Sequence, residues 1–250
     1  MPVSVATLEA VLKRDRAIVA AALALVAALA WADLVFMAAG MGDGGAASRW
    51  SAGYFAATFA MWAIMMAGMM IPSAAPAVLL FAALRRHAKA SSAAPALLFA
   101  CGYLVAWTAF SLAATVAQWR LSEAALLSPA MKSESAAFAG ALFVAAGLFQ
   151  FSGLKAACLA KCRSPAQFLV ERRRDGLLGA LVMGIEHGTY CVGCCWALMA
   201  LLFAFGVMNL LWVAVLAAYV LAEKLLPAGP AVARAGGAAM MGLGIVLFIA

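Results

Sequence analysis

Charged side chains are scarce in this sequence: Asp, Glu, Lys and Arg make up 11% of its 250 residues, whereas hydrophobic residues make up 68%. Soluble domains carry about 25% charged residues, so the composition excludes an ordinary soluble protein. Segments of about ten residues that alternate between apolar and polar side chains are also missing, and a membrane-spanning backbone must satisfy its own hydrogen bonds. The sequence therefore predicts an all-α, polytopic transmembrane bundle that forms one membrane domain over residues 1–250.

The sequence also lacks a G-x-x-x-x-G-K-[ST] loop, so no P-loop in this chain powers a reaction. The net charge is +7, but the Lys and Arg residues fall in short clusters between apolar runs, which indicates membrane orientation and no nucleic-acid partner. The six Cys residues lie outside long polar loops, and five of them crowd into two patches. This distribution excludes a secreted disulfide framework and indicates metal or redox chemistry.

Apolar runs predict about seven membrane spans. They cover residues 17–39, 54–84, 95–119, 136–154, 177–205, 208–226 and 236–250. The apolar stretch between residues 177 and 227 is too long for one crossing of about 20 residues, so we predict a break at residues 206–209. Residues 28–30 resemble a signal-peptide cleavage site, but the first run continues to Gly40, which favours an uncleaved span.

Basic residues predict which side of the membrane each loop occupies. Lys and Arg gather at the N-terminus, near residues 85–89, near residues 155–174 and around Lys224 and Arg234, whereas the loops between these segments hold few of them. Cytoplasmic loops carry such an excess of positive charge. We therefore expect a cytoplasmic N-terminus, an external C-terminus and membrane lipid around the bundle.

The second predicted span carries a ladder of five methionines at helical spacing. Three recur every fourth residue and two form an adjacent stripe: Met61, Met65 and Met69, then Met66 and Met70. A thioether binds a soft ion such as Cu(I) without losing a proton, although Met also serves as flexible packing material. Pro72 follows the ladder and removes the N–H partner of the Gly68 carbonyl, and Pro76 repeats the effect one turn later, so we expect a kink near a binding site or a path.

The fifth predicted span contains GIEHGTYCVGCCW at residues 184–196, a run of soft ligands inside an apolar segment. On a helix with about 100° per residue, one face collects five candidate ligands: His187, Cys191, Cys194, Cys195 and Met183. Glu186 lies just beside this face. Ionisable groups near the membrane midplane usually face a bundle interior and mark an ion path. The pattern predicts a metal site, with Cu(I) as the first candidate and Zn as the second.

Other roles for this helix are structural or redox. His187 could donate to a carbonyl and Glu186 could pair with Lys or Arg, while the Cys residues could simply pack. Cys191-x-x-Cys194 resembles the thioredoxin redox spacing, although no βαβ pattern accompanies it. Four ligands along one helix span about 12 Å, so at least one ligand must come from a second helix. Gly184 and Gly188 form a G-x-x-x-G motif that allows close helix approach, and the Met helix is the expected neighbour.

A further thiol pair, Cys158 and Cys162, lies at the inner end of the fourth predicted span. Lys155, Lys161 and Arg163 lie beside this pair, and nearby cations favour the thiolate form that binds metal. We therefore expect a cytoplasmic thiol pair that follows the Met ladder and the Cys/His face along a graded path. Cys101 stands alone in the sequence and is expected in the core.

These segments resemble a bacterial family of uncharacterised, predicted metal-binding integral membrane proteins. The resemblance covers roughly residues 55–227 and rests on MWAIMMAGMMIPS, LKAACLAKCRSP and HGTYCVGCCWALMALLF, followed by GVMNLLW and EKLLP. It implies a multi-pass protein of the bacterial plasma (inner) membrane with a metal role, and it implies no particular reaction. The positions that match the family pattern are His187, Cys191, Cys194, Cys195, Cys158 and Cys162.

The leading hypothesis is a non-enzymatic membrane protein that binds Cu(I) and moves it or hands it over. In this hypothesis the Met ladder is the entry, the Cys/His face is the central site, and Cys158 with Cys162 is the cytoplasmic acceptor. An alternative is a membrane assembly factor or subunit that holds copper for a cuproenzyme, with a metal chaperone or the cuproenzyme as its partner. A thiol redox membrane protein and a packing protein without a site are the remaining alternatives.

Overall fold

A computed structural model describes residues 5–40, 50–85, 93–127, 131, 133 and 135–249. Over these residues the chain forms helices joined by turns and short connections, with an isolated bridge between Leu127 and Ser133. The helices are α1 (Val5–Gly40), α2 (Ala52–Arg85), α3 (Ala94–Glu123), α4 (Ala136–Gln150), α5 (Gly153–Arg163), α6 (Pro165–Glu171), α7 (Gly176–Ala200), α8 (Leu202–Phe205), α9 (Leu210–Leu225) and α10 (Gly229–Ile249). The all-α prediction is confirmed.

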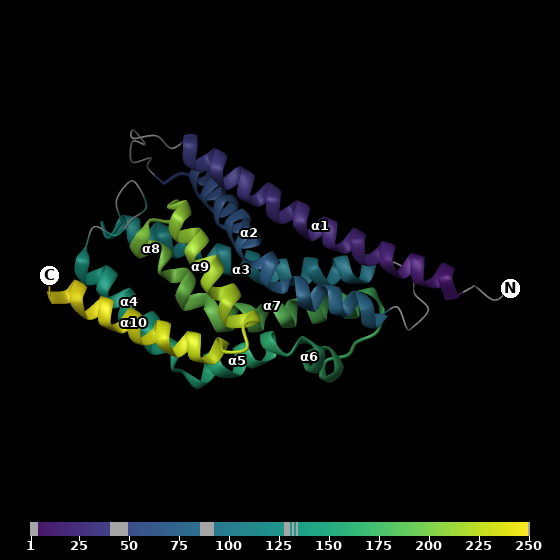
Figure 1. Cartoon of the computed structure of the whole chain (residues 1–250). Coiled ribbons are helices and arrows are strands. Elements are labelled where there is room, and N and C mark those ends of the chain that lie inside the picture. The colour runs from purple at the N-terminus through teal and green to yellow at the C-terminus, as the bar shows by residue number, and fades with distance from the viewer. Residues whose placement is uncertain are drawn as a thin grey trace.

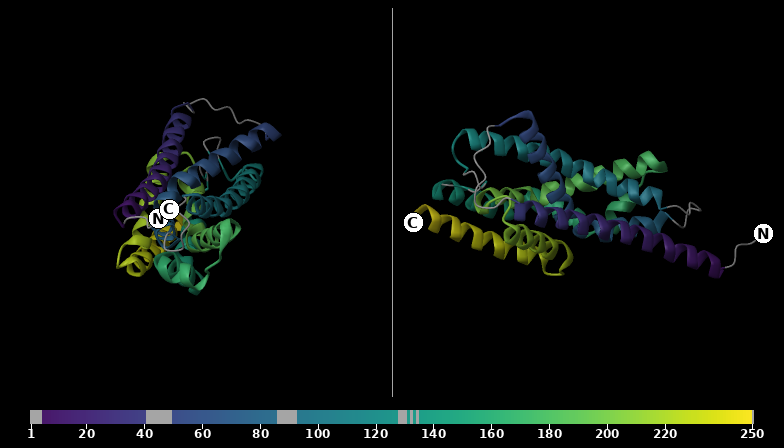
Figure 2. Two further views of the ribbon diagram at one scale, coloured as in Figure 1. Left: turned by 90° about the vertical axis from the view of Figure 1, so that its right-hand side faces the viewer. Right: turned by 90° about the horizontal axis from the view of Figure 1, so that it is seen from above.

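The helices form an elongated bundle in which α7 is packed between α3 and α5 (Figure 1). Helix α1 packs along α2, which in turn packs on α3, and α4 pairs with α10. The first turns of α1 and the last turns of α10 lie at opposite ends of the long axis, as the view from above shows (Figure 2). The bundle therefore places α7 and its ligand-rich sequence at the centre of the molecule.

Five helical segments of the described residues are long and apolar enough to cross a membrane: Ala17–Ala39, Ala52–Leu84, Ala94–Glu123, Gly176–Phe205 and Gly229–Ile249. Helices α4 and α5 qualify only as a pair, bent by 64° at their junction. The predicted count of seven spans is thus not confirmed. One reason is that α9 has only 16 residues and carries Glu223 and Lys224 near its end.

Helix α5 occupies a stretch that the charge pattern assigns to a basic loop. Ser152 begins this helix, because its hydroxyl accepts a hydrogen bond from the backbone N–H of Lys155 at 3.1 Å. Lys155 itself is 1% exposed, and Lys224 in α9 is 6% exposed. Using these two cations as orientation signals is therefore wrong, since both lie inside the bundle. The basic residues at 86, 87 and 89 fall outside the described residues, and the orientation stays a prediction.

Glycines let α3 and α7 pack with their backbones almost in contact. A Cβ atom on Gly184 would lie 2.0 Å from the carbonyl oxygen of Phe99, and one on Gly188 would lie 2.8 Å from that of Tyr103. Gly102 of α3 is equally close to α7, with 2.1 Å between its hypothetical Cβ and the carbonyl oxygen of Leu181. The G-x-x-x-G motif thus permits close helix packing, but its neighbour is α3 and not the Met helix α2.

The carbonyl group that Pro72 deprives of a partner is satisfied by α1. Trp31 donates its indole N–H to the Gly68 oxygen at 3.3 Å, which is the oxygen that an ordinary residue at position 72 would bond. Further along, Gly206 has a φ of 96° and ends α8, and Asn209 caps α9. The chain turns at residues 206–209, where the sequence predicts a break.

Replacing Trp31 by phenylalanine should destabilise the protein by about 1 kcal/mol, because the ring still packs but the Gly68 carbonyl loses its hydrogen bond. Thermal unfolding in detergent measures this change. Trp31→Phe in a Pro72→Ala background is the matched control, since an alanine N–H at position 72 restores the helical partner. An equal loss in both backgrounds would contradict the assigned role of Trp31.

Candidate metal centre

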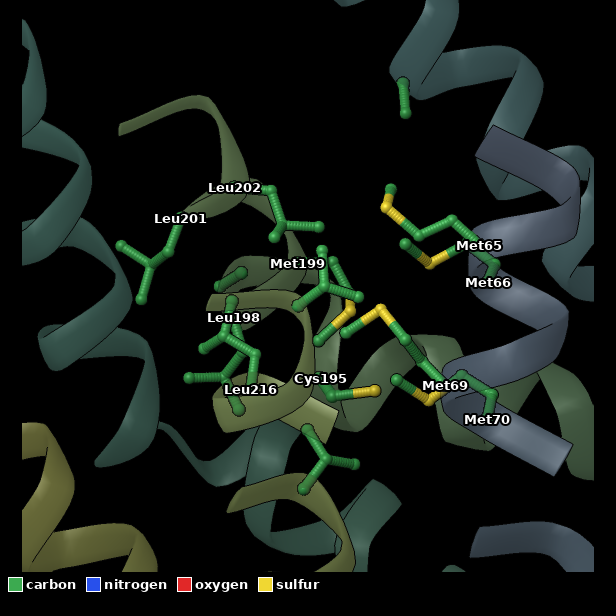
Figure 3. Packing of buried hydrophobic residues seen from close by; sticks show 14 of the residues in the cluster. Met65, Met66, Met69, Met70, Cys195, Leu198, Met199, Leu201, Leu202 and Leu216 are labelled. Carbon is green, nitrogen blue, oxygen red and sulfur yellow. The ribbon is translucent and has the colours of Figure 1, made fainter. Parts of the chain in front are cut away.

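Sulfur atoms from three helices gather in the core around α7. The methionines of α2 are at most 5% exposed, and the three cysteines of α7 are at most 1% exposed. All of them belong to one packed cluster, which also includes Met199 and Cys158: Met61, Met65, Met66, Met69, Met70, Cys191, Cys194 and Cys195. Figure 3 shows the thioethers of α2 directed toward the side of α7 that carries Cys195 and Met199. The spacing of four residues on both helices aligns the two sets of side chains.

Helix α5 brings the thiol pair of the fourth predicted span against α7. The Sγ atoms of Cys162 and Cys194 are 4.0 Å apart, and a Cβ on Gly193 would lie 2.8 Å from the Sγ of Cys158. Two thiolates that each lie about 2.3 Å from one ion, at an angle of about 120°, are about 4 Å apart. The Cys162–Cys194 pair therefore has the spacing of two ligands of one ion. The prediction of Cys158 and Cys162 as a separate cytoplasmic station is not supported, because both contact the central helix.

Cys191 is held by polar groups from two other helices, α3 and α9. Its Sγ lies 2.9 Å from the Tyr103 hydroxyl of α3 and accepts a hydrogen bond from the Lys224 ammonium of α9 at 2.9 Å. Lys224 also donates to Ser73 of α2 at 2.9 Å. The Tyr103 hydroxyl donates in addition to the Met70 carbonyl at 3.2 Å. One hydroxyl group thus connects the Met helix to the central thiol.

The other two thiols of α7 point back along their own helix. Cys194 donates its S–H to the Cys191 carbonyl at 3.1 Å, and Cys195 donates to the same oxygen at 3.0 Å. Such bonds to the carbonyl three or four residues earlier hold a side chain against its helix. Both thiols act as donors in this arrangement, so binding of a metal ion by them has to displace their protons.

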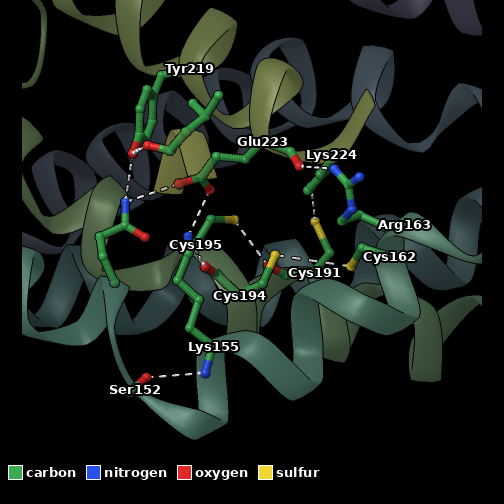
Figure 4. Close-up of polar contacts among 12 residues, drawn as sticks. Ser152, Lys155, Cys162, Arg163, Cys191, Cys194, Cys195, Tyr219, Glu223 and Lys224 are labelled. Carbon is green, nitrogen blue, oxygen red and sulfur yellow. Dashed lines mark hydrogen bonds and ion pairs between the residues drawn. The ribbon is translucent and has the colours of Figure 1, made fainter. Parts of the chain in front are cut away.

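A buried, charge-neutral network lies directly beside the thiols (Figure 4). Lys155 and Glu223, each 1% exposed, form an ion pair of 2.7 Å, and Lys155 also donates to the Cys194 carbonyl at 3.0 Å. Gln150 donates to Glu223 and to the Tyr219 hydroxyl. Sequence reasoning missed this network. The signal that could have revealed it is Glu223-Lys224 at the end of an apolar run, since ionisable residues in such runs face a bundle interior.

The cations that neighbour Cys158 and Cys162 in sequence have other partners in the structure. Lys161 forms an ion pair with Glu171, and Arg163 donates to the backbone carbonyls of Glu223 and Leu226. Lys155 is paired with Glu223, so none of these three cations directs its charge at the thiol pair. The prediction that they stabilise the thiolates of Cys158 and Cys162 is therefore wrong. Cys101 is exposed, which corrects its predicted place in the core.

His187 lies one turn from Cys191 but in an aromatic environment. It is 3% exposed, and its ring centroid is 5.8, 6.0 and 5.1 Å from those of Phe99, Tyr103 and Phe168. Its Nδ1 atom has no hydrogen-bond partner among the described residues. The buried and unpartnered nitrogen keeps His187 a candidate ligand, although nothing in this arrangement places it beside the thiol pair.

Met183 and Glu186 belong to another part of α7. Met183 packs in a second core cluster with Phe99 and Phe168, and its sulfur accepts a hydrogen bond from the Arg174 backbone at 3.4 Å. Glu186 forms an ion pair of 2.7 Å with the Arg174 side chain. Glu186 therefore makes the ion pair considered as its alternative to ligation, and neither residue converges with the cysteines.

Among the described residues, no three His, Cys, Asp or Glu side chains converge closely enough to hold one ion by themselves. The Cys162–Cys194 pair is the core of the arrangement, and the methionines of α2 supply further sulfur donors in the packed cluster to which Cys194 belongs. Zinc in structural sites takes four N or S ligands in a tetrahedron, whereas Cu(I) is selected by soft thiolate and thioether ligands. The donor set therefore fits Cu(I) better than Zn.

Comparison with known proteins gives one family match. Residues 59–247 match the model of the family described as PpoB2, copper chaperone. The matched range includes the methionines of α2, both cysteines of α5 and all three cysteines of α7. Neither the curated proteins nor the solved structures yield a match. The match confirms the predicted copper-related role at the level of the family.

Proposed function

The chain belongs to the PpoB2 family of copper chaperones, and from this premise we propose that it binds Cu(I) as cargo at the sulfur cluster between α5 and α7 and hands it to a copper-requiring protein. The observation that carries the proposal is the 4.0 Å separation of the Cys162 and Cys194 sulfur atoms at a buried cluster that also holds six thioethers, five of them from α2. Cu(I) replaces the thiol protons of this pair.

The position of the pair suits a chaperone that must release its cargo. Cys194 lies on the central helix and is 0% exposed, whereas Cys162 lies near the end of α5 and is partly exposed. Helix α5 packs on α7 and is separated from α4 by a bend of 64°. A ligand at the end of a short helix can separate from its partner with less disturbance of the core than a ligand on α7, so Cys162 is the proposed release side.

A second candidate function is passage of Cu(I) across the membrane along α2. It is favoured by the Met ladder, which places five buried thioethers over successive turns of one spanning helix beside the α7 cysteines. Thioethers bind Cu(I) without proton exchange, and a row of such ligands suits an ion that moves between sites. In either case the chain is a multi-pass protein of the bacterial inner membrane, without catalytic activity of its own.

The proposed function is tested with the purified full-length chain in detergent, loaded with Cu(I) under anaerobic conditions. We expect about one tightly bound Cu(I) per chain by element analysis, and transfer of that ion to an apo copper protein faster than its spontaneous loss to buffer. Binding without transfer would limit the protein to storage, and absence of binding would remove the proposal. Reversible disulfide formation between Cys191 and Cys194 without metal would instead support the redox alternative.

An uptake assay in proteoliposomes that enclose a Cu(I)-sensitive probe distinguishes handover from membrane passage. Passage predicts a probe signal that depends on the chain and is lost when Met65 and Met69 are replaced by leucine, which retains volume but not the sulfur. Handover alone predicts no internal signal, while transfer to an external acceptor continues.

A further inference from the structure

Lys224 is a buried cation without a carboxylate partner among the described residues. Its ammonium group donates to Ser73 and to the Sγ of Cys191, both at 2.9 Å. The adjacent Glu223 is already paired with Lys155 at 2.7 Å. An isolated ammonium group inside a membrane bundle is costly, so a counter-charge at the sulfur cluster would explain its presence.

The charges around the cluster can be counted for each cargo ion. Cu(I) held by two thiolates has a net charge of −1, and Zn(II) held by the same two thiolates has none. Lys155 and Glu223 cancel each other. With Cys191 counted as a neutral thiol whose S–H donates to the Tyr103 oxygen, the positive charge of Lys224 remains. A loaded site with Cu(I) is therefore neutral, whereas a loaded site with Zn(II) leaves one buried positive charge without compensation, and uncompensated buried charge is strongly unfavourable.

We propose that Lys224 is a specificity-determining residue whose fixed positive charge makes the sulfur cluster selective for monovalent soft cations over divalent ones. The inference rests on the proposed function, because it assumes that the thiols hold the cargo. Lys224 touches Cys191 and acts on the ion through space, so it is a positioning and charge-balancing residue and no ligand. Ser73 orients the ammonium group toward the cluster from α2.

The size of the effect follows from Coulomb's law. One extra unit charge about 6 Å from an ammonium group, at an effective dielectric constant of about 20, changes the affinity by about a hundredfold. Cu(I) and Zn(II) gain equally from the attraction between Lys224 and the two thiolates. The ratio of the two affinities therefore isolates the repulsion of the second charge on Zn(II).

The test measures Cu(I) and Zn(II) affinities of the purified full-length protein by competition with chromophoric chelators. In Lys224→Met the ratio of Cu(I) to Zn(II) affinity should fall by about a hundredfold relative to the unmodified protein. Lys224→Arg keeps the charge and should keep the ratio. The double variant Lys155→Met/Glu223→Gln removes a charge-neutral pair from the same region, and it should leave the ratio unchanged as well.

The outcomes separate the inference from the function on which it rests. If the unmodified protein binds no Cu(I), the proposed function fails. If Lys224→Met binds Cu(I) with an unchanged ratio, the selectivity role is overturned while the proposed function stands. Lys224→Gln provides a second neutral variant where Lys224→Met does not fold, as judged by thermal unfolding. A ratio that drops in Lys224→Arg as far as in the neutral variants would also overturn the inference, since the charge is retained there.

Discussion

A variant in which Cys162 and Cys194 are both replaced by serine is expected to lose at least about a thousandfold in Cu(I) affinity, because a hydroxyl oxygen is a hard donor that does not replace a thiolate on a soft ion. Loss of an outer partner of a metal ligand already costs about 10–100-fold, and here both sulfur atoms of the 4.0 Å pair are removed. Anaerobic competition with a chromophoric Cu(I) chelator measures the affinity.

The matched control is Cys101→Ser, which removes an exposed thiol on α3 far in sequence from the cluster. Its Cu(I) affinity should equal that of the unmodified protein. The single variants Cys162→Ser and Cys194→Ser should lose less than the double variant loses, and their effects should not add, since both thiols bind the same ion. Retention of tight binding in the double variant would show that Cu(I) uses other sulfur atoms.

Replacing Gly184 by leucine is expected to prevent stable folding. The Cβ position at this residue lies 2.0 Å from the Phe99 carbonyl oxygen, 2.8 Å from its carbon and 3.0 Å from its Cα, all backbone atoms of α3. A backbone cannot rotate away as a side chain can, so the two helices must separate. The cost should exceed the roughly 1–3 kcal/mol of ordinary overpacking, against a total stability of about 5–15 kcal/mol for a typical protein.

Thermal unfolding and size-exclusion profiles in detergent measure this loss. Gly242→Leu is the matched control, because among the described residues nothing beyond the adjacent backbone of α10 lies within 4 Å of its Cβ position. That variant should fold and bind Cu(I) normally. A Gly184→Leu protein with the stability of the Gly242→Leu protein would mean that α3 and α7 are not packed as described.

Much of the candidate centre is accessible from local sequence patterns. Spacings of three and four residues put the cysteines of α7 and the methionines of α2 on single faces. The four candidate ligands from His187 to Cys195 span about 12 Å along one helix, which predicts that a second helix supplies a ligand. Proline has no backbone N–H, so Pro72 correctly identifies the Gly68 carbonyl as one without a helical partner. Each of these predictions depends only on the geometry of one helix.

Other features depend on contacts between helices that no local pattern specifies. Lys155 and Lys224 look like loop cations in the sequence, yet the bundle buries them beside Glu223 and Cys191. The partner of the Gly184 motif is α3, because Gly102 on that helix provides a matching gap. Periodicity shows which side of a helix is apolar or sulfur-rich, but it does not show which helix that side meets.

The sequence by itself determined that the chain is helical and of membrane-protein composition, with a Met ladder, a Cys/His helix and a thiol pair suited to a soft ion. Composition, helical period and ligand softness are properties of short segments, so they can be taken from the sequence. Only the tertiary structure decided that Cys162 lies 4.0 Å from Cys194, that Lys224 faces Cys191, and that Glu186 pairs with Arg174 instead of joining the site. The physical reason is that these distances depend on how α5, α7 and α9 pack, and packing is set by side chains far apart in the chain.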